Sequence, residues 1–160
     1  MKILFPVISI IFAIATFVGA ITKQINFTQE CGGYLKRAAN ANTVELAVDN
    51  LEKAILYLED NGITKGYTSV LWKTPDEDIE YWYKNLKSAY NELKSLPMDN
   101  KLLCDNALMK LKETLIDNTK DGEKLVVPNG ISRYPNNKTW AVFIFLASFA
   151  LFCVFIDFYN

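Results

Sequence analysis

The sequence contains no histidine among its 160 residues. Histidine is the commonest general base in enzymes, a common zinc ligand, and the partner that activates serine or cysteine nucleophiles. The chain also lacks a Walker loop, a G-x-G-x-x-G segment and a C-x-x-C pair. We therefore expect a protein that is not an enzyme and that has no catalytic residue, no metal ligand and no cofactor.

Charged residues are also missing from two long segments, residues 3–21 and residues 140–156, one near each end of the chain. A helix needs about 20 apolar residues to cross the roughly 30 Å hydrocarbon core of a bilayer. The first segment follows a basic start, Met1-Lys2, and ends with Val18-Gly19-Ala20, the pattern of a signal-peptide cleavage site. We interpret residues 1–22 as an uncleaved signal anchor that forms an N-terminal transmembrane helix; a cleaved signal peptide is the alternative.

The second apolar segment predicts a C-terminal transmembrane helix at residues 139–160. Trp140 stands at its beginning and Tyr159 just past its end, where amphipathic rings favour the headgroup region. Small side chains in both segments would let two membrane helices pack closely. The residues that we expect at such helix contacts are Ala15, Gly19, Ala147 and Ala150.

Basic residues give opposite indications of the orientation in the membrane. Lys2 favours a cytoplasmic N-terminus, which places the middle of the chain outside. Four residues before the second span favour a cytoplasmic middle: Lys120, Lys124, Arg133 and Lys138. The first span usually dominates, and loops longer than about 60 residues cross the membrane largely regardless of their charge. We therefore expect both termini in the cytoplasm and an extracytoplasmic domain.

The middle of the chain predicts a helical domain at residues 23–118. Its first stretch, around residues 24–40, contains Cys31-Gly32-Gly33, and each of the paired glycines costs about 1 kcal/mol inside a helix. We expect either an interruption there or a kinked extension of the first span. The second stretch has a capping-box start at residues 42–45 and apolar residues at a period of about 3.6. Asn61-Gly62 supplies its stop.

Two further helices are predicted after residue 73. One begins at Thr74-Pro75, with Glu77 completing a capping box, and ends at Pro97. The other begins at Asp99 and turns apolar residues inward from Leu103 onward. Helices with one apolar stripe bury these stripes against one another. The predicted fold is an all-α membrane protein, in which two terminal transmembrane helices enclose a three- or four-helix antiparallel bundle.

The connections between these helices hold the candidate interaction residues. We expect residues 62–73, which are rich in aromatic and aliphatic side chains, to fold back over the end of the bundle. Residues 119–138 predict an extended linker near the membrane that could hold a short β-hairpin. Exposed aromatic residues often anchor protein interfaces. The partner-binding candidates are Tyr67, Trp72, Tyr81 and Tyr83, whereas Trp82 fits the core stripe.

Two groups of residues have both a functional and a structural interpretation. The densest acidic cluster consists of Asp76, Glu77, Asp78 and Glu80. It could bind a hard cation, but acidic residues in a first helical turn also complement the helix dipole, and we favour that second role. Cys31 and Cys104 are the two cysteines outside the apolar ends, and they could form a disulfide in an oxidising compartment or remain free thiols.

The 17 basic and 18 acidic residues are interspersed, which gives no electrostatic reason to bind nucleic acid. The leading hypothesis is a small membrane accessory or assembly subunit whose helical domain binds other proteins within a larger membrane complex. Its expected partners are other subunits of that complex or copies of itself, together with the lipid bilayer. The alternatives are a self-assembling homo-oligomeric membrane scaffold and a ligand- or metal-binding sensor domain.

Overall fold

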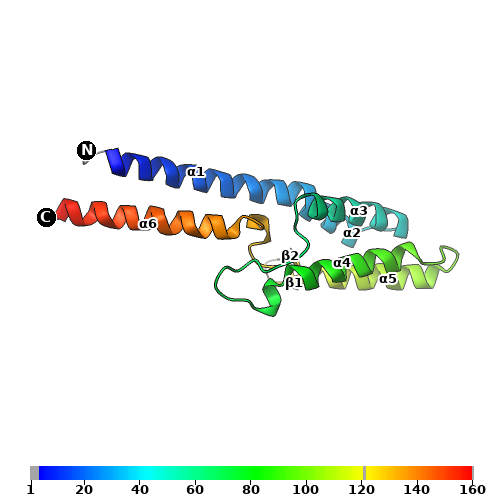
Figure 1. Cartoon of the computed structure of the whole chain (residues 1–160). Coiled ribbons are helices and arrows are strands. Elements are labelled where there is room, and N and C mark those ends of the chain that lie inside the picture. Colours follow the sequence, from blue (N-terminus) through cyan, green and yellow to red (C-terminus); the bar gives the residue numbers. More distant parts are fainter. Residues whose placement is uncertain (1–3, 121, 160) are drawn as a thin grey trace.

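The computed structural model describes residues 4–120 and 122–159, and it is mostly helical. Helix α1 (Leu4–Phe27) and helix α6 (Asn137–Tyr159) run side by side in opposite directions, so that the beginning of α1 and the end of α6 lie together and the remaining elements gather at the other end (Figure 1). Both terminal helices are long and apolar enough to cross a membrane. Lys2, on which the expected orientation depends, lies outside the described residues.

Helices α1 and α6 touch through a small residue and several rings. A Cβ atom added to Gly19 would lie 2.7 Å from Cη2 of Trp140, so the indole occupies the space that a larger side chain would need. Phe12 and Phe143 form an edge-to-face pair with ring centroids 4.8 Å apart. Gly19 therefore lies at a close contact between two helices of the same chain.

The other small residues expected at helix contacts divide between two environments. Ala147 and Ala150 are half-buried and follow Phe143 by four and seven residues, so all three share one face of α6. This face is turned towards α1, because Phe143 contacts Phe12 there. Ala15, in contrast, is exposed.

The chain passes from α1 into α2 (Gly33–Ala39) through a single π-helical turn, η1 (Thr28–Gly32). Of the two expectations for Cys31-Gly32-Gly33, the structure favours the extension of the first helix, because the chain stays helical through these residues. The backbone N–H of Gly33 donates to the carbonyl of Thr28, which closes the wider turn. The Leu125 side chain packs close to the buried Gly32, since a Cβ atom on this glycine would lie 3.7 Å from it, an ordinary contact distance.

Helix α3 (Val44–Asp60) begins and ends close to where its sequence predicts. The Thr43 hydroxyl accepts a hydrogen bond from the backbone N–H of Leu46 at 3.3 Å, which caps the first turn. At the other end Gly62 has a φ of +67°, and the N–H of Ile63 donates to the carbonyl of Leu58 at 2.7 Å. The predicted Asn61-Gly62 stop is confirmed.

Helix α4 (Ile79–Lys94) begins later than predicted. The Glu77 carboxylate does accept a hydrogen bond from the Thr74 hydroxyl at 2.9 Å, but this pair closes a separate 3₁₀ turn, η2 (Pro75–Glu77). Asp78 is extended, with φ −77° and ψ 105°, because its backbone forms a β-bridge with Tyr67. Its carboxylate then caps α4 by accepting hydrogen bonds from two backbone N–H groups.

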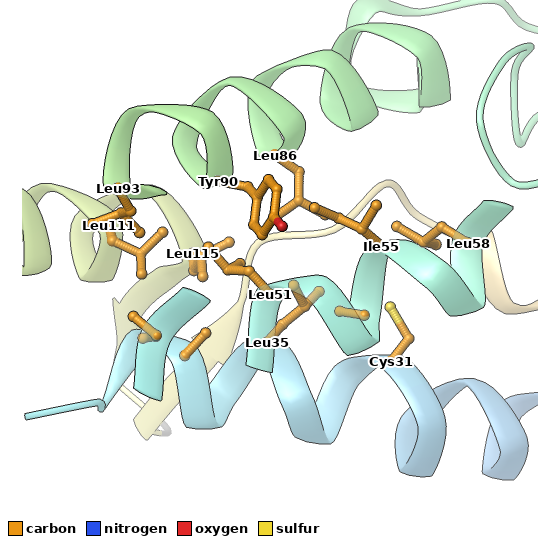
Figure 2. Packing of buried hydrophobic residues seen from close by; sticks show 14 of the residues in the cluster. Cys31, Leu35, Leu51, Ile55, Leu58, Leu86, Tyr90, Leu93, Leu111 and Leu115 are labelled. Atoms are coloured by element: carbon orange, nitrogen blue, oxygen red, sulfur yellow. The ribbon is translucent and has the colours of Figure 1, made fainter. Parts of the chain in front are cut away.

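Helix α5 (Lys101–Leu115) follows α4, and helices α2 to α5 pack around one apolar cluster (Figure 2). Five of its side chains are almost wholly buried: Leu35, Leu51, Leu58, Ile79 and Leu93. The apolar stripes predicted on α3 and α4 are thereby confirmed. Leu103 is 44% exposed, so the inward stripe predicted for α5 is wrong at its beginning and right at Leu111 and Leu115.

An antiparallel hairpin follows α5 directly. Strand β1 (Ile116–Thr119) pairs with β2 (Gly122–Leu125), with Ile116 opposite Leu125. The expected boundary between residues 118 and 119 falls inside β1. After the hairpin, the short helix η3 (Ile131–Arg133) buries Ile131 in the core cluster, and Val127 and Tyr134 pack against it. Residues 126–134 thus pack against the domain, whereas their turn-rich composition predicts an extended linker.

Candidate interaction surface

The loop between α3 and α4, residues 61–78, is fixed at its base. The N–H of Thr68 donates to the carbonyl of Glu77 at 3.0 Å, and the N–H of Ile79 donates to the carbonyl of Gly66 at 2.9 Å. From α6, the buried Asn137 amide donates to the carbonyl of Thr68 at 2.7 Å. These bonds tie the loop both to the start of α4 and to the first residue of α6.

The tip of the same loop is exposed. Leu71 is 81% exposed, Trp72 is 73% exposed, and Val70 beside them is exposed as well. The expectation that this segment folds back over the bundle end is therefore wrong for its most apolar residues. A side-chain hydrogen bond holds the turn, because the Ser69 hydroxyl accepts from the backbone N–H of Trp72 at 3.0 Å.

Two of the four aromatic residues predicted to bind a partner, Tyr67 and Tyr83, make contacts within the chain. Tyr67 is half-buried, its backbone bridges to Asp78, and the ammonium of Lys73 lies 5.6 Å from its ring centroid. Tyr83 is also half-buried, and its hydroxyl donates to the Glu59 carboxylate at 2.5 Å. These contacts give both side chains a role in the packing of the chain itself.

The Glu59 carboxylate connects α3 to α4. The ammonium of Lys87 donates to the same oxygen that accepts from Tyr83, at 2.6 Å. These hydrogen bonds, first from Lys87 and then from Tyr83, lower the pKa of Glu59 below its ordinary 4.5. The pKa of the Tyr83 phenol is raised, chiefly by burial and then by the neighbouring carboxylate. At neutral pH the Glu59 carboxylate is therefore ionised and can accept hydrogen bonds, while the Tyr83 phenol is protonated and can donate one.

Glu59→Gln is expected to lower the free energy of unfolding at neutral pH by less than about 1 kcal/mol, because water screens a pair that is more than one-third exposed. Since the Glu59 pKa is lowered on folding, its contribution is present above pH 4.5 and is lost as the pH falls through the folded-state pKa. Urea unfolding of both proteins in mild detergent, at neutral pH and at about pH 3, measures the difference. An equal difference at both pH values would contradict this role.

Tyr81 lies differently, at the edge of an open groove of about 500 Å³. Its side chain is 65% exposed, and it shares the groove with residues from α4, from the β-hairpin and from the segment after it. The indole N–H of Trp82 donates to the carbonyl of Val126 at 3.1 Å, which joins the two walls. Asp117 and Lys124 place charges of both signs along the same groove. The groove is therefore lined by both apolar and charged residues, and one of its rings is largely exposed.

A second open groove, of about 580 Å³, lies between η1 and the segment of the chain that ends in η3. Phe27, Gly32 and Gly33 line one side, and Leu125 and Ile131 line the other. Within the sequence, the glycine pair is the one feature that marks this position, and it does not indicate a groove. Each groove joins segments at least 25 residues apart, so local periodicity could not predict either of them.

The acidic cluster at the start of α4 is largely used in the structure. Glu77 closes the η2 turn, Asp78 caps α4, and Glu80 pairs with Lys84 at 2.6 Å. These contacts support the structural role that we favoured for the cluster. Among the residues that the structure describes, no group of three or more His, Cys, Asp or Glu is placed to hold a metal ion.

Cys31 and Cys104, offered as a disulfide pair, are both free thiols in the structure. Cys31 is fully buried in the core cluster, near Leu35 and Leu58 (Figure 2). Cys104 is in the first turns of α5, and its thiol lies 3.8 Å from the carbonyl of Pro97. In the sequence, the two cysteines are compatible with a disulfide and with free thiols. The folded structure distinguishes the two states, and both thiols are free in it.

No protein-family model, no curated protein and no solved structure matches this chain.

Proposed function

We propose that this chain is a two-span membrane protein whose helical domain binds another subunit of a membrane complex. Helices α1 and α6 form the spans, both termini lie on the cytoplasmic side, and helices α2 to α5 form an antiparallel bundle outside. The side chains exposed along α1 and α6 include Phe17, Ile21, Phe145 and Phe149. Such a surface would be costly in water and suits lipid, which supports the placement.

The groove beside Tyr81 carries the functional part of the proposal. An exposed tyrosine at the rim of a preformed cleft is a common anchor for a protein partner, because it offers a large rigid ring and a hydroxyl with little conformational entropy to lose. The groove combines exposed polar groups with the apolar side chains of Trp82, Leu86 and Val126. We assign it to a segment of a partner subunit that inserts an apolar side chain and pairs its polar groups with Asp117 and Lys124.

Tyr81→Ala is expected to weaken partner binding by more than about tenfold, the effect of losing an interface anchor worth 2 kcal/mol or more. The measurement is native purification of the tagged full-length chain in mild detergent, followed by the mass and composition of the particle. Tyr83→Phe is the matched control on the same helix, because it removes only the hydrogen bond to Glu59 and should retain the partner.

A stoichiometric foreign subunit that is lost with Tyr81→Ala and kept with Tyr83→Phe would support the proposal. A particle that contains only copies of this chain would overturn it in favour of the homo-oligomeric scaffold. For that alternative, Gly19, Ala147 and Ala150 offer little support, since they lie on the contact face between α1 and α6 of one chain. The alternative of a ligand- or metal-binding sensor also loses support. Most residues of the acidic cluster at the start of α4 close a turn, cap a helix or form an ion pair.

A further inference from the structure

We propose that the tip of the loop between α3 and α4, residues 69–73, inserts into the headgroup region of the bilayer and forms a third membrane contact of this chain. The inference rests on the proposed function, in which α1 and α6 span that bilayer. It assigns a lipid partner to Trp72, which the sequence offered as a residue that binds protein.

The composition of the tip suits an interface between water and hydrocarbon. Val70, Leu71 and Trp72 are consecutive and exposed, so the domain leaves three large apolar side chains in a row without cover. Tryptophan favours the headgroup region because its ring is apolar while its N–H can still reach a polar partner. Lys73 follows at once; its ammonium lies 5.6 Å from the Tyr67 ring centroid and can leave this exposed contact for lipid phosphate while its stem lies along apolar surface.

The base of the loop is fixed at the level where α6 begins. Asn137 is the first residue of α6, and its amide donates to the carbonyls of Tyr67 and Thr68, at 3.3 Å and 2.7 Å. The Tyr134 hydroxyl, just before α6, donates to the carbonyl of Lys65. The tip is therefore one to five residues from Thr68, which is attached to the start of a span. A short excursion from this anchor reaches the membrane surface.

The direction of the loop agrees with this position. Figure 1 shows that the loop between α3 and α4 projects from the domain towards the end at which α1 and α6 leave it. The connection between α4 and α5 lies at the opposite end of the domain (Figure 1). Other exposed apolar residues, such as Leu102 and Met109 on α5, belong to that helix and have no such link to a span. This contrast selects the bilayer as the occupant of the loop tip.

The chain's three tryptophans provide the test, since each lies in a different expected environment. Full-length single-tryptophan variants are placed in phosphatidylcholine vesicles with and without brominated acyl chains, which quench nearby indoles. Trp82→Phe with Trp140→Phe leaves Trp72 as the reporter. Trp72→Phe with Trp82→Phe leaves Trp140 in α6, and Trp72→Phe with Trp140→Phe leaves Trp82 on the domain groove. Circular dichroism checks that each variant remains helical.

We expect brominated lipid to reduce the emission of Trp72 and of Trp140 by comparable fractions, and to leave Trp82 unchanged. Quenching of Trp140 without quenching of Trp72 would overturn the loop contact while leaving the spans intact. If Trp140 also escapes quenching, the spans of the proposed function fail, and the loop contact is overturned with them. The two failures are therefore distinguishable.

A second measurement keeps all three tryptophans and so applies even if Trp82→Phe weakens the fold. Leu71→Cys is labelled with an environment-sensitive fluorophore in a Cys104→Ser, Cys153→Ala background, in which Cys31 is buried and unreactive. Asp99→Cys, in the connection between α4 and α5, is the matched control. A blue shift in vesicles at residue 71 and none at residue 99 would support the insertion. Water-like emission at both positions would overturn it.

Discussion

Leu51→Ala is expected to lower the free energy of unfolding by about 2–5 kcal/mol, the largest effect that we predict for a single core substitution. Leu51 is 0% exposed and belongs to the cluster that α2, α3, α4 and α5 share (Figure 2). Its truncation removes buried contacts and leaves a cavity that surrounding helices fill only in part. Urea unfolding of the full-length chain in mild detergent, followed by circular dichroism, measures the change.

Leu56→Ala is the matched control, because it makes the same chemical change on the same helix at a residue that is 52% exposed. We expect this control to change the free energy of unfolding by no more than about 0.5 kcal/mol. Equal effects at the two positions would contradict the placement of α3. A large effect at Leu56 alone would mean that the opposite face of this helix is the buried one.

The buried faces of α3 and α4 could be predicted from the sequence, because their apolar residues recur at the period of a helix. Leu51 and Leu58 are spaced as one helical face requires, and both are fully buried. The stop at Gly62 was predictable for a similar reason, since its left-handed φ favours glycine there. The two apolar ends also follow from composition alone, and the structure shows them as long helices that lie together.

The errors arose where a distant segment decides the local conformation. The predicted start of α4 at Thr74-Pro75 was displaced to Ile79, because a β-bridge between Tyr67 and Asp78 keeps Asp78 extended. Gly32 and Gly33 are compatible with a break in the first helix or with its extension, and the structure shows a continuous helix with the Leu125 side chain close to Gly32. Tyr67 is a loop residue 11 positions before Asp78, and Leu125 lies 93 positions after Gly32, so neither contact is part of a helical periodicity.

The candidate site was predictable as a list of residue types but not as a surface. Aromatic residues flanking α4 suggested an interface, yet their roles depend on contacts that composition does not contain. Tyr83 is bonded to Glu59 from another helix, while Tyr81 is exposed beside a groove whose second wall includes Val126. Trp72 is separated from both by its place on a loop attached to α6. Only the tertiary arrangement distinguishes the surroundings of these similar side chains.

Gly66→Ala is the second substitution with a large expected effect, a loss of about 2–4 kcal/mol in the free energy of unfolding. Gly66 has a φ of +101°, a conformation that residues with a Cβ atom rarely adopt. The added Cβ would also collide with the Tyr134 ring, whose hydroxyl bonds to the carbonyl of Lys65. The substitution therefore combines backbone strain with a steric clash at the attachment between the loop and the chain before α6. Urea unfolding in mild detergent measures it.

Gly62→Ala separates the two causes. Gly62 has a φ of +67° but nothing within 4 Å of the added Cβ, so we expect only the backbone cost of about 1–2 kcal/mol. Tyr134→Ala provides the complementary background, because it removes the ring with which the Cβ collides. In that background Gly66→Ala should lose its steric part, which appears as a coupling between the two substitutions. Additive effects of Gly66→Ala and Tyr134→Ala would show that the loop does not press against Tyr134, and the proposed fixation of the loop beside α6 would then lose one of its two supports.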